Sequence, residues 1–183
     1  SQSPRCRELL TLMGLDFTVI SSHVEELPPE NATPAAYVEA LALQKAEAVA
    51  TAHPSDVVIG ADTIVYLDGD ILGKPYTPEN AKRYLTRMQN RTHTVYTGVA
   101  VIADGKPDIR HCCTDVTFAP MSEAEIDWYV ATGEPLDKAG AYGVQGPGGI
   151  FVERVDGNYF NVIGMPLPLL YQMLNKAGAL AEM

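Results

Sequence analysis

Five stretches of the chain place apolar residues three or four positions apart, which is the pattern of an amphipathic helix. Ser3, Thr33, Thr77 and Ser122 are typical N-caps before such stretches, and Ser122 with Glu125 has the spacing of a capping box. The predicted helices run from Pro4 to Gly14, from Pro34 to about Ala50, from Pro78 to Met88, from Ser122 to near Gly133 and from Pro166 to Ala177.

Between these helices lie shorter runs of apolar and β-branched residues, which predict strands. Asp-Gly pairs at 68–69 and 104–105 mark tight turns, and the second pair predicts an antiparallel hairpin. Because helices and strands interleave, we expect an α/β protein with a mixed sheet and flanking helices. The predicted strands cover 17–20, 56–66, 94–103, 109–119 and 150–155.

Composition limits the possible functions. The 183 residues, 46% of them apolar, suffice for one sizeable core, so we expect a single domain over 1–183. The formal net charge of −10 argues against binding a nucleic acid polymer. No apolar run approaches the roughly 20 residues of a membrane span, and no signal peptide is evident. We therefore expect a cytoplasmic protein that does not associate with a membrane. The odd number of cysteines, three, favours reduced thiols. The histidines are scattered, which disfavours a zinc site.

Asp62 interrupts an otherwise apolar strand. A buried carboxylate without a partner is costly, so the chain must supply a cation, a metal or an open cleft. One interpretation is a turn residue after Gly60 that caps its own backbone. The other is a metal ligand or general base at a strand end, where α/β proteins bind ligands.

Two lysines also stand in unusual places. Lys45 shares a helix face with apolar residues such as Leu41 and Val49, so either its stem is buried while its ammonium snorkels to water, or the lysine has a function. Lys74 follows the predicted turn, where it is either a solvated turn residue or a functional one. Its surroundings do not match the P-loop pattern G-x-x-x-x-G-K-[ST].

Glycines gather near the end of the chain, where seven of the fifteen fall between Gly140 and Gly164. They do not form a G-x-G-x-x-G motif, so we predict no dinucleotide fold. The cluster either allows close approach of the backbone to a ligand or forms a mobile loop. Within it, the Gln145 amide is suited to the edge of a nucleobase.

Several of these features suit a small, highly charged ligand. The first turn of the N-terminal helix, at residues 3–5, joins free backbone N–H groups to a guanidinium, which suits a phosphate or is ordinary capping. Hard oxygen ligands favour Mg²⁺ or Mn²⁺. A nucleoside triphosphate with such a metal would contact basic side chains through its phosphates and acidic side chains through the metal. The basic positions are Arg5, Lys45 and Lys74, and the acidic ones are Glu26 and Asp62.

Six blocks of sequence, in order, resemble the Maf family of nucleoside triphosphate pyrophosphatases. Together they cover essentially the whole chain. The blocks are SQSPRCRELL at 1–10, GADTIV at 60–65, LGKP at 72–75, TGVAV at 97–101, DKAGAYGVQG at 137–146 and GNYFNVIGMP at 157–166.

The resemblance implies hydrolysis of a nucleoside triphosphate to the monophosphate and pyrophosphate, with a divalent metal. It also implies an ITPase-like fold, in which a mixed sheet is split around a deep central cleft, and the option of a homodimer. The block AGAYGVQG is similar to the branch of the family that acts on dTTP and UTP.

The resemblance also implies roles for individual residues. Asp62 corresponds to the proton acceptor that activates water, and with Glu26 it would hold the metal. Lys45 and Lys74 match charged positions that line the family's cleft.

A second set would bind the substrate. Arg5, Thr63 and Gln145 correspond to positions associated with substrate choice, and Ser3 lies beside them in the first motif.

Two departures from the family pattern leave alternatives open. Cys6 stands where the family usually has the second arginine of S-x-S-P-R-R, and Arg7 follows one place later. The family also has a short apolar strand before the position of Ser1, which implies that this strand has been trimmed. The alternatives are a house-cleaning enzyme for modified pyrimidine nucleotides, and a nucleotide-sensing regulator of cell division without significant turnover, which Cys6 favours.

Overall fold

The computed structural model describes residues 3–180, which divide into two compact units. Unit 1 takes the chain as far as Thr63, residues 97–112, and the chain from Gly164 onward. Unit 2 takes residues 64–96 and 113–163. The expectation of a single domain stays a prediction.

Three of the four predicted N-caps are confirmed by a capping hydrogen bond. Thr33, Thr77 and Ser122 each accept a hydrogen bond from the backbone N–H three residues further on, and the capping box of Ser122 and Glu125 is complete. The short α5 and three 3₁₀ turns were not expected. The α-helices are α1 (Pro4–Leu12), α2 (Pro34–Ala50), α3 (Pro78–Met88), α4 (Glu123–Ala131), α5 (Tyr159–Ile163) and α6 (Leu167–Lys176), and the 3₁₀ turns are η1 (Glu134–Asp137), η2 (Ala139–Ala141) and η3 (Pro147–Phe151).

The strands form a five-stranded sheet in the order β2-β1-β3-β4-β5. They are β1 (Val58–Leu67), β2 (Asp70–Leu72), β3 (Thr92–Ala103), β4 (Lys106–Phe118) and β5 (Val152–Asp156). The α/β class is confirmed. The sheet is antiparallel, which refines the expected mixed sheet: β1 pairs with β2, and β4 pairs with β5, in antiparallel ladders. The deep central cleft stays a prediction.

The strand predicted at 17–20 is wrong, because this segment is not part of the sheet. One hollow of about 470 Å³ in unit 1 is lined both by residues 17–20 and by residues 57–61, which include the start of β1. Open space therefore lies where the two extended segments would have to meet. An apolar, β-branched run becomes a strand only when its backbone groups find a neighbour in a ladder.

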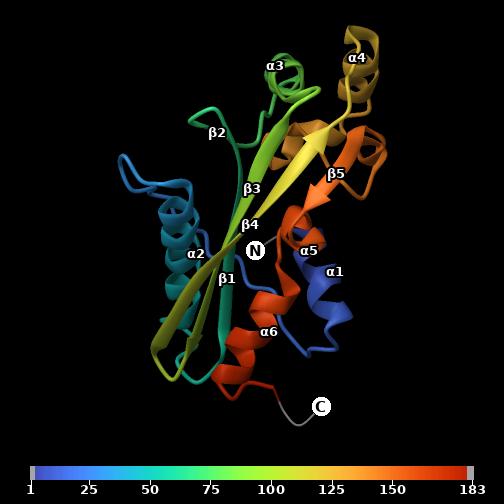
Figure 1. Cartoon of the computed structure of the whole chain (residues 1–183). Coiled ribbons are helices and arrows are strands. Elements are labelled where there is room, and N and C mark those ends of the chain that lie inside the picture. The colour runs from blue at the N-terminus through green and yellow to red at the C-terminus, as the bar shows by residue number, and fades with distance from the viewer. Residues whose placement is uncertain (1–2, 181–183) are drawn as a thin grey trace. The chain divides into compact units, whose positions relative to one another are not determined.

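Each unit has its own apolar core. In unit 1, Ala42 and Ala46 of α2 pack with Val58, Ala100 and Ile102 of the strands. Figure 1 shows α2 along one side of these strands, with α1 and α6 on the other side. The core of unit 2 contains Leu85, Met88, Val95, Phe118, Ile126, Tyr129, Tyr142 and Phe151 among others.

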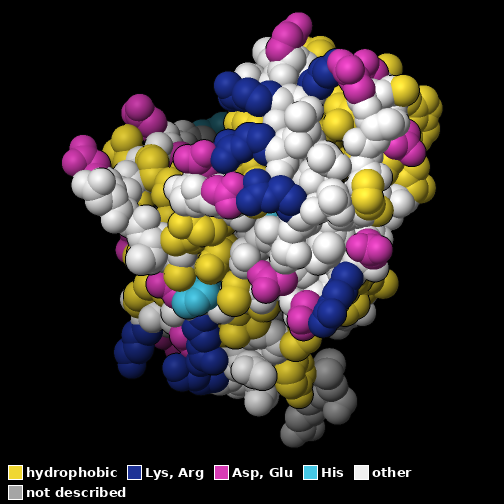
Figure 2. Space-filling view, turned by 45° about the horizontal axis from the view of Figure 1, so that its top comes forward, with side chains coloured by type: hydrophobic (Ala, Val, Ile, Leu, Met, Phe, Trp, Pro, Cys, Tyr) yellow, Lys and Arg dark blue, Asp and Glu magenta, His cyan; other side chains and the backbone are white. Residues whose placement is uncertain are grey.

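Charged side chains on the face drawn in Figure 2 lie in mixed groups, basic beside acidic. Ion pairs of the chain include Arg87 with Asp70 at 2.8 Å and Arg91 with Asp68 at 2.7 Å. Among residues 3–180, no helix is long and apolar enough to cross a bilayer. The expectation that the protein binds no nucleic acid polymer stays a prediction.

Candidate active site

Helix α2 lies directly against β1 and β3, because two glycines leave no side chain between them. A Cβ atom on Gly60 would collide with the carbonyl oxygen of Ala42, and one on Gly98 with the carbonyl oxygen of Val38. Either collision would push the helix away from the sheet. This close packing places Lys45, on the same helix, beside β1.

Lys45 lies between two carboxylates, and we call Glu26, Lys45 and Asp62 the ion cluster. Its Nζ atom is 2.7 Å from Oδ1 of Asp62 on β1 and 2.8 Å from Oε1 of Glu26, in the loop before α2. The Asp62 side chain is 11% exposed and that of Glu26 is 50% exposed. The cluster therefore extends from the buried strand towards solvent, and Asp62 has the cation that its burial requires.

The charge state of Lys45 follows from these contacts. Burial opposes the ammonium form, but the charges and hydrogen bonds of Asp62 and Glu26 outweigh it and raise the pKa of Lys45 above its usual value. Lys45 thus remains an ammonium at neutral pH. The snorkelling interpretation is wrong in its main point, since the ammonium meets anions.

Tyr37 lies near the same carboxylates and was missed in the sequence. Burial, followed by the charges of Asp62 and Glu26, raises the pKa of the Tyr37 hydroxyl. A neutral phenol near two carboxylates is a potential hydrogen-bond donor. Tyr37 precedes Lys45 by two helical turns, a spacing on one face of a helix that is a weak but readable signal.

Gln44 fixes the loop that carries Glu26. Its Oε1 atom accepts a hydrogen bond from the backbone N–H of Leu27 at 3.1 Å, and its Nε2 atom donates to the Leu27 carbonyl at 2.7 Å. The amide therefore satisfies both backbone groups of the residue next to Glu26. No local pattern in the sequence predicts this contact, because it joins a loop and a helix 17 residues apart.

Thr63 follows Asp62 on β1 and is held by β3. Its Oγ1 atom is 2.9 Å from Oγ1 of Thr97, which is fully buried. A Cβ atom on Gly164 would lie 3.5 Å from the same oxygen of Thr63. The hydroxyl predicted to take part in substrate choice is therefore in a defined position.

The first turn of α1 carries the other predicted residues of unit 1. Ser3 is the N-cap of α1, and Arg5 lies in the first turn, with both side chains half-buried. The thiol of Cys6 contacts the carbonyl oxygen of Gly164 at 3.8 Å. Arg7 lines the same hollow as Lys45. The residue that replaces the expected arginine thus contacts the backbone of the chain at Gly164, and its neighbour Arg7 lies at the wall of the hollow.

Lys74 and Gln145 belong to unit 2. Both are exposed, and both stand on segments whose backbone is held. The carbonyl of Gly73 accepts a hydrogen bond from the N–H of Gly140 at 3.2 Å, and the carbonyl of Pro75 accepts one from the Asn80 side chain at 3.3 Å. Lys74 is therefore a surface lysine on a fixed turn, in a position open to an anionic ligand.

Direct contacts join Glu26, Lys45 and Asp62 in unit 1, whereas Lys74 and Gln145 belong to unit 2. Among residues 3–180, no group of three His, Cys, Asp or Glu side chains could hold a metal. Glu26 and Asp62 nevertheless already share one cation, the ammonium of Lys45. Two hard carboxylates around a cation fit Mg²⁺ or Mn²⁺ provided that substrate oxygens and water complete the shell.

Comparisons with known proteins identify the family of the chain. A family model described as "Maf-like protein" matches residues 1–177. The dTTP/UTP pyrophosphatase of Moorella thermoacetica is 51% identical over 176 residues, which are 95% of this chain and 91% of that protein. The dTTP/UTP pyrophosphatases of Bacillus cytotoxicus and Symbiobacterium thermophilum are 49% and 46% identical over 96% and 97% of this chain, and 92% of each relative is covered. The chain belongs to the Maf family.

Proposed function

We propose that this protein hydrolyses dTTP and UTP to the nucleoside monophosphate and pyrophosphate, with Mg²⁺ or Mn²⁺. The observation that carries the proposal is the ion cluster, in which Lys45 contacts Asp62 at 2.7 Å and Glu26 at 2.8 Å. Paired carboxylates beside a fixed ammonium suit the binding of a phosphate chain with its metal. The names of relatives at 46% to 51% identity support the substrate class and favour turnover over nucleotide sensing.

In the proposed reaction, the carboxylate of Asp62 orients a water molecule and accepts its proton. The water oxygen bonds to the α-phosphorus, and the bond from this phosphorus to the bridging oxygen breaks. The electron pair of that bond leaves with pyrophosphate. A divalent metal held by Glu26 and Asp62 would polarise the α-phosphate when bound.

The cations of the site stabilise the charge that develops on the phosphates. Lys45 is fixed as an ammonium by its neighbours, so it offers a positive charge without further rearrangement. We assign Arg5 and Lys74 to the same task on the basis of the matching family positions.

We assign substrate choice to Ser3, Arg5, Thr63 and Gln145. The hydroxyl of Thr63 is positioned by Thr97, and the exposed amide of Gln145 can pair with the edge of a pyrimidine. A site that pairs with a base edge rejects bases that leave its polar groups unmatched. Modified pyrimidine nucleotides are further candidates, and kinetics over a nucleotide panel separates them from dTTP and UTP.

We further propose that the protein acts in the cytoplasm on free nucleotides, not on a nucleic acid polymer or a membrane, and that it forms a homodimer. The net charge of −10 supports the first part, since a long polyanion would be repelled. Light scattering coupled to size-exclusion chromatography measures the oligomeric state, and a monomer at all concentrations would contradict the dimer.

The test of the function is pyrophosphate release from dTTP, UTP, CTP, ATP and GTP by the full-length protein, with Mg²⁺ or Mn²⁺. Asp62→Asn is expected to abolish release from every nucleotide while the protein still melts cooperatively. Asp70→Asn is the matched control, because Asp70 pairs with Arg87 at an exposed position of unit 2.

The outcomes of this test are distinct. Metal-dependent release from dTTP and UTP that vanishes in Asp62→Asn supports the reaction and the role of Asp62. Full activity in Asp62→Asn refutes that role. Nucleotide binding without any release by the unaltered protein refutes the enzyme and supports the sensor.

A further inference from the structure

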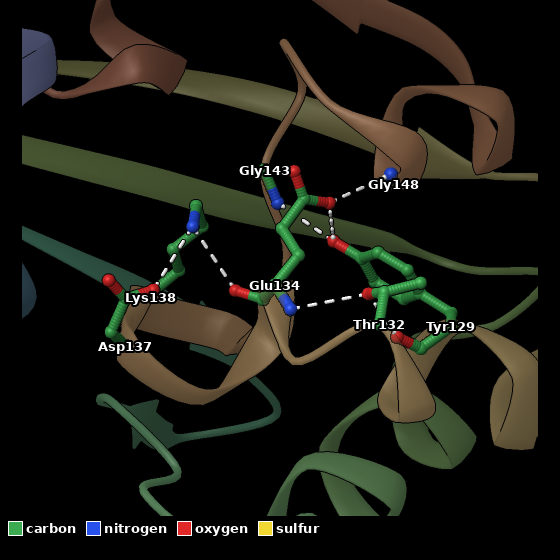
Figure 3. A network of polar contacts seen from close by, with 7 residues as sticks. All are labelled: Tyr129, Thr132, Glu134, Asp137, Lys138, Gly143 and Gly148. Carbon is green, nitrogen blue, oxygen red and sulfur yellow. Dashed lines mark hydrogen bonds and ion pairs between the residues drawn. The ribbon is translucent and has the colours of Figure 1, made fainter.

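The carboxylate of Glu134 holds the chain on the far side of Gln145. Glu134 lies at the start of η1, and its Oε2 atom accepts hydrogen bonds from the hydroxyl of Tyr129 at 2.6 Å and from the backbone N–H of Gly148 at 3.0 Å. Figure 3 shows both contacts converging on this one oxygen. A charged acceptor makes stronger hydrogen bonds than a neutral one, so this contact fixes the backbone at Gly148.

The same relay holds the chain on the near side of Gln145. The hydroxyl oxygen of Tyr129 accepts a hydrogen bond from the backbone N–H of Gly143 at 3.1 Å while it donates to Glu134. We call residues 143–148 the Gln145 loop. Both of its ends are therefore bonded to a single pair of side chains, Tyr129 and Glu134.

The glycines of the loop are needed for space. A Cβ atom on Gly146 would collide with the carboxylate of Glu134, and one on Gly148 would collide with the hydroxyl of Tyr129. The φ angle of Gly146 is −114°, which any residue can adopt. These glycines thus let the backbone approach the two polar side chains, and this explains part of the glycine cluster in the sequence.

The relay is itself firmly anchored. Tyr129 is fully buried, and its ring packs against Phe151 with ring centroids 5.6 Å apart. Burial and the contact with Glu134 raise the pKa of Tyr129, so its hydroxyl stays a donor. The backbone of Glu134 is held by Thr132, whose Oγ1 atom accepts from the Glu134 N–H at 3.2 Å, and by Lys138, whose Nζ atom donates to the Glu134 carbonyl at 3.1 Å.

We propose that Glu134 and Tyr129 are positioning residues that fix the Gln145 loop and thereby set the selectivity of the protein for pyrimidine bases. The proposal rests on the proposed function, in which Gln145 recognises the base. Gln145 is exposed between Val144 and Gly146, so its amide reaches a ligand while the loop behind it stays in place. A loop fixed before binding loses less conformational entropy when the base is bound.

The test measures kcat and KM for dTTP and CTP. Glu134→Ala is expected to raise the KM for dTTP about tenfold, the equivalent of one well-placed hydrogen bond, and to change the KM for CTP much less. Glu134→Gln keeps an oxygen acceptor and is expected to restore most of the selectivity. Glu123→Ala is the control, since Glu123 is an exposed carboxylate of the same unit.

A double-mutant cycle separates positioning from general damage. In a Gln145→Ala background, Glu134→Ala is expected to have no further effect on the ratio of the two KM values. An equal loss for both nucleotides, or the same loss of selectivity without Gln145, overturns the proposal. Tyr129→Phe keeps the buried ring and decides the matter if Glu134→Ala does not fold.

Failure of the proposed function gives a different result. If the unaltered protein releases no pyrophosphate from any nucleotide, the same variants are compared by calorimetry for their dissociation constants with dTTP and CTP. Loss of discrimination in Glu134→Ala then supports positioning without catalysis. Unchanged discrimination overturns it.

Discussion

The ion cluster of unit 1 and the Gln145 loop of unit 2 use carboxylates in opposite ways. In the ion cluster, Asp62 and Glu26 contact the ammonium of Lys45, the charged end of a long side chain. In the Gln145 loop, Glu134 accepts from a buried phenol and a backbone N–H. The first arrangement has partners that can be exchanged for a ligand, whereas the second has partners that are fixed by the fold.

The difference is one of function. A site for phosphates and a metal must exchange contacts during each turnover, so ion pairs near solvent suit it. A loop that recognises a base must keep its shape, and hydrogen bonds to backbone groups provide this. In the functions proposed above, the same chemical group thus serves reaction in one unit and positioning in the other.

The strongest test of this comparison is the removal of the exchangeable cation. Lys45→Ala is expected to lower kcat about 10²- to 10³-fold, as for the loss of one well-placed donor to the reacting phosphates. Pyrophosphate release from dTTP measures the effect. The helix should remain, because the backbone contact between α2 and Gly60 does not involve this side chain.

Lys82→Ala is a matched control for that experiment. Lys82 also contacts two carboxylates, Glu123 at 2.9 Å and Asp127 at 2.7 Å, but its side chain is 40% exposed. Its removal should leave turnover unchanged. Equal losses in the two variants would mean that Lys45 has no special part in the reaction.

A second test lowers the pH, because an uncharged histidine is buried beside the residue that precedes the Gln145 loop. His93 is buried, and its Nε2 atom is 2.7 Å from the hydroxyl of Tyr142, the residue that precedes the loop. Burial lowers the pKa of His93 to about 4, although the charge of Asp115 acts in the opposite direction. Protonation of this ring is therefore coupled to unfolding.

The sign follows from the proton balance. Between pH 6.5 and 4 the unfolded chain binds the proton and the folded protein does not, so stability falls as the pH falls through this range. The full loss is about 3 kcal/mol, measured as the free energy of unfolding in urea. His93→Phe should remove this dependence and His53→Asn should not. An unchanged pH slope in His93→Phe would contradict the assignment.

The smallest expected effect concerns the support of Glu26. Gln44→Ala removes two hydrogen bonds to Leu27 and should raise the concentration of Mg²⁺ needed for half-maximal activity roughly 2- to 10-fold. A titration with metal at saturating dTTP measures it. Gln172→Ala, an exposed glutamine on α6 of the same unit, is the control. An unchanged metal requirement in Gln44→Ala would show that the loop needs no such support.

Local signals predicted the elements of the fold well. Thr33, Thr77 and Ser122 cap their helices as expected, because capping depends on residues three positions apart. The strand at 17–20 failed for the opposite reason, since an extended run needs a partner that no local pattern reveals. The antiparallel course of the sheet likewise depends on which strands meet.

The candidate site was predictable only in part. An aspartate inside an apolar strand and a lysine on an apolar helix face are each unusual, and the structure explains both because Asp62 and Lys45 are partners. Glu26 carried no such local signal and was named only as a second acidic position that could hold a metal. Gln44, Tyr129 and Glu134 were missed because their contacts join segments that only the folded chain brings together.

The two glycines under α2 have a consequence for genetics. Gly60 and Gly98 carry no functional group, yet any side chain at either position would strike the backbone of the helix that bears Lys45. A screen for inactive alleles will therefore recover substitutions at these two codons alongside those of the charged residues. In such a screen, loss of activity at these codons will report the close packing of α2 against the strands.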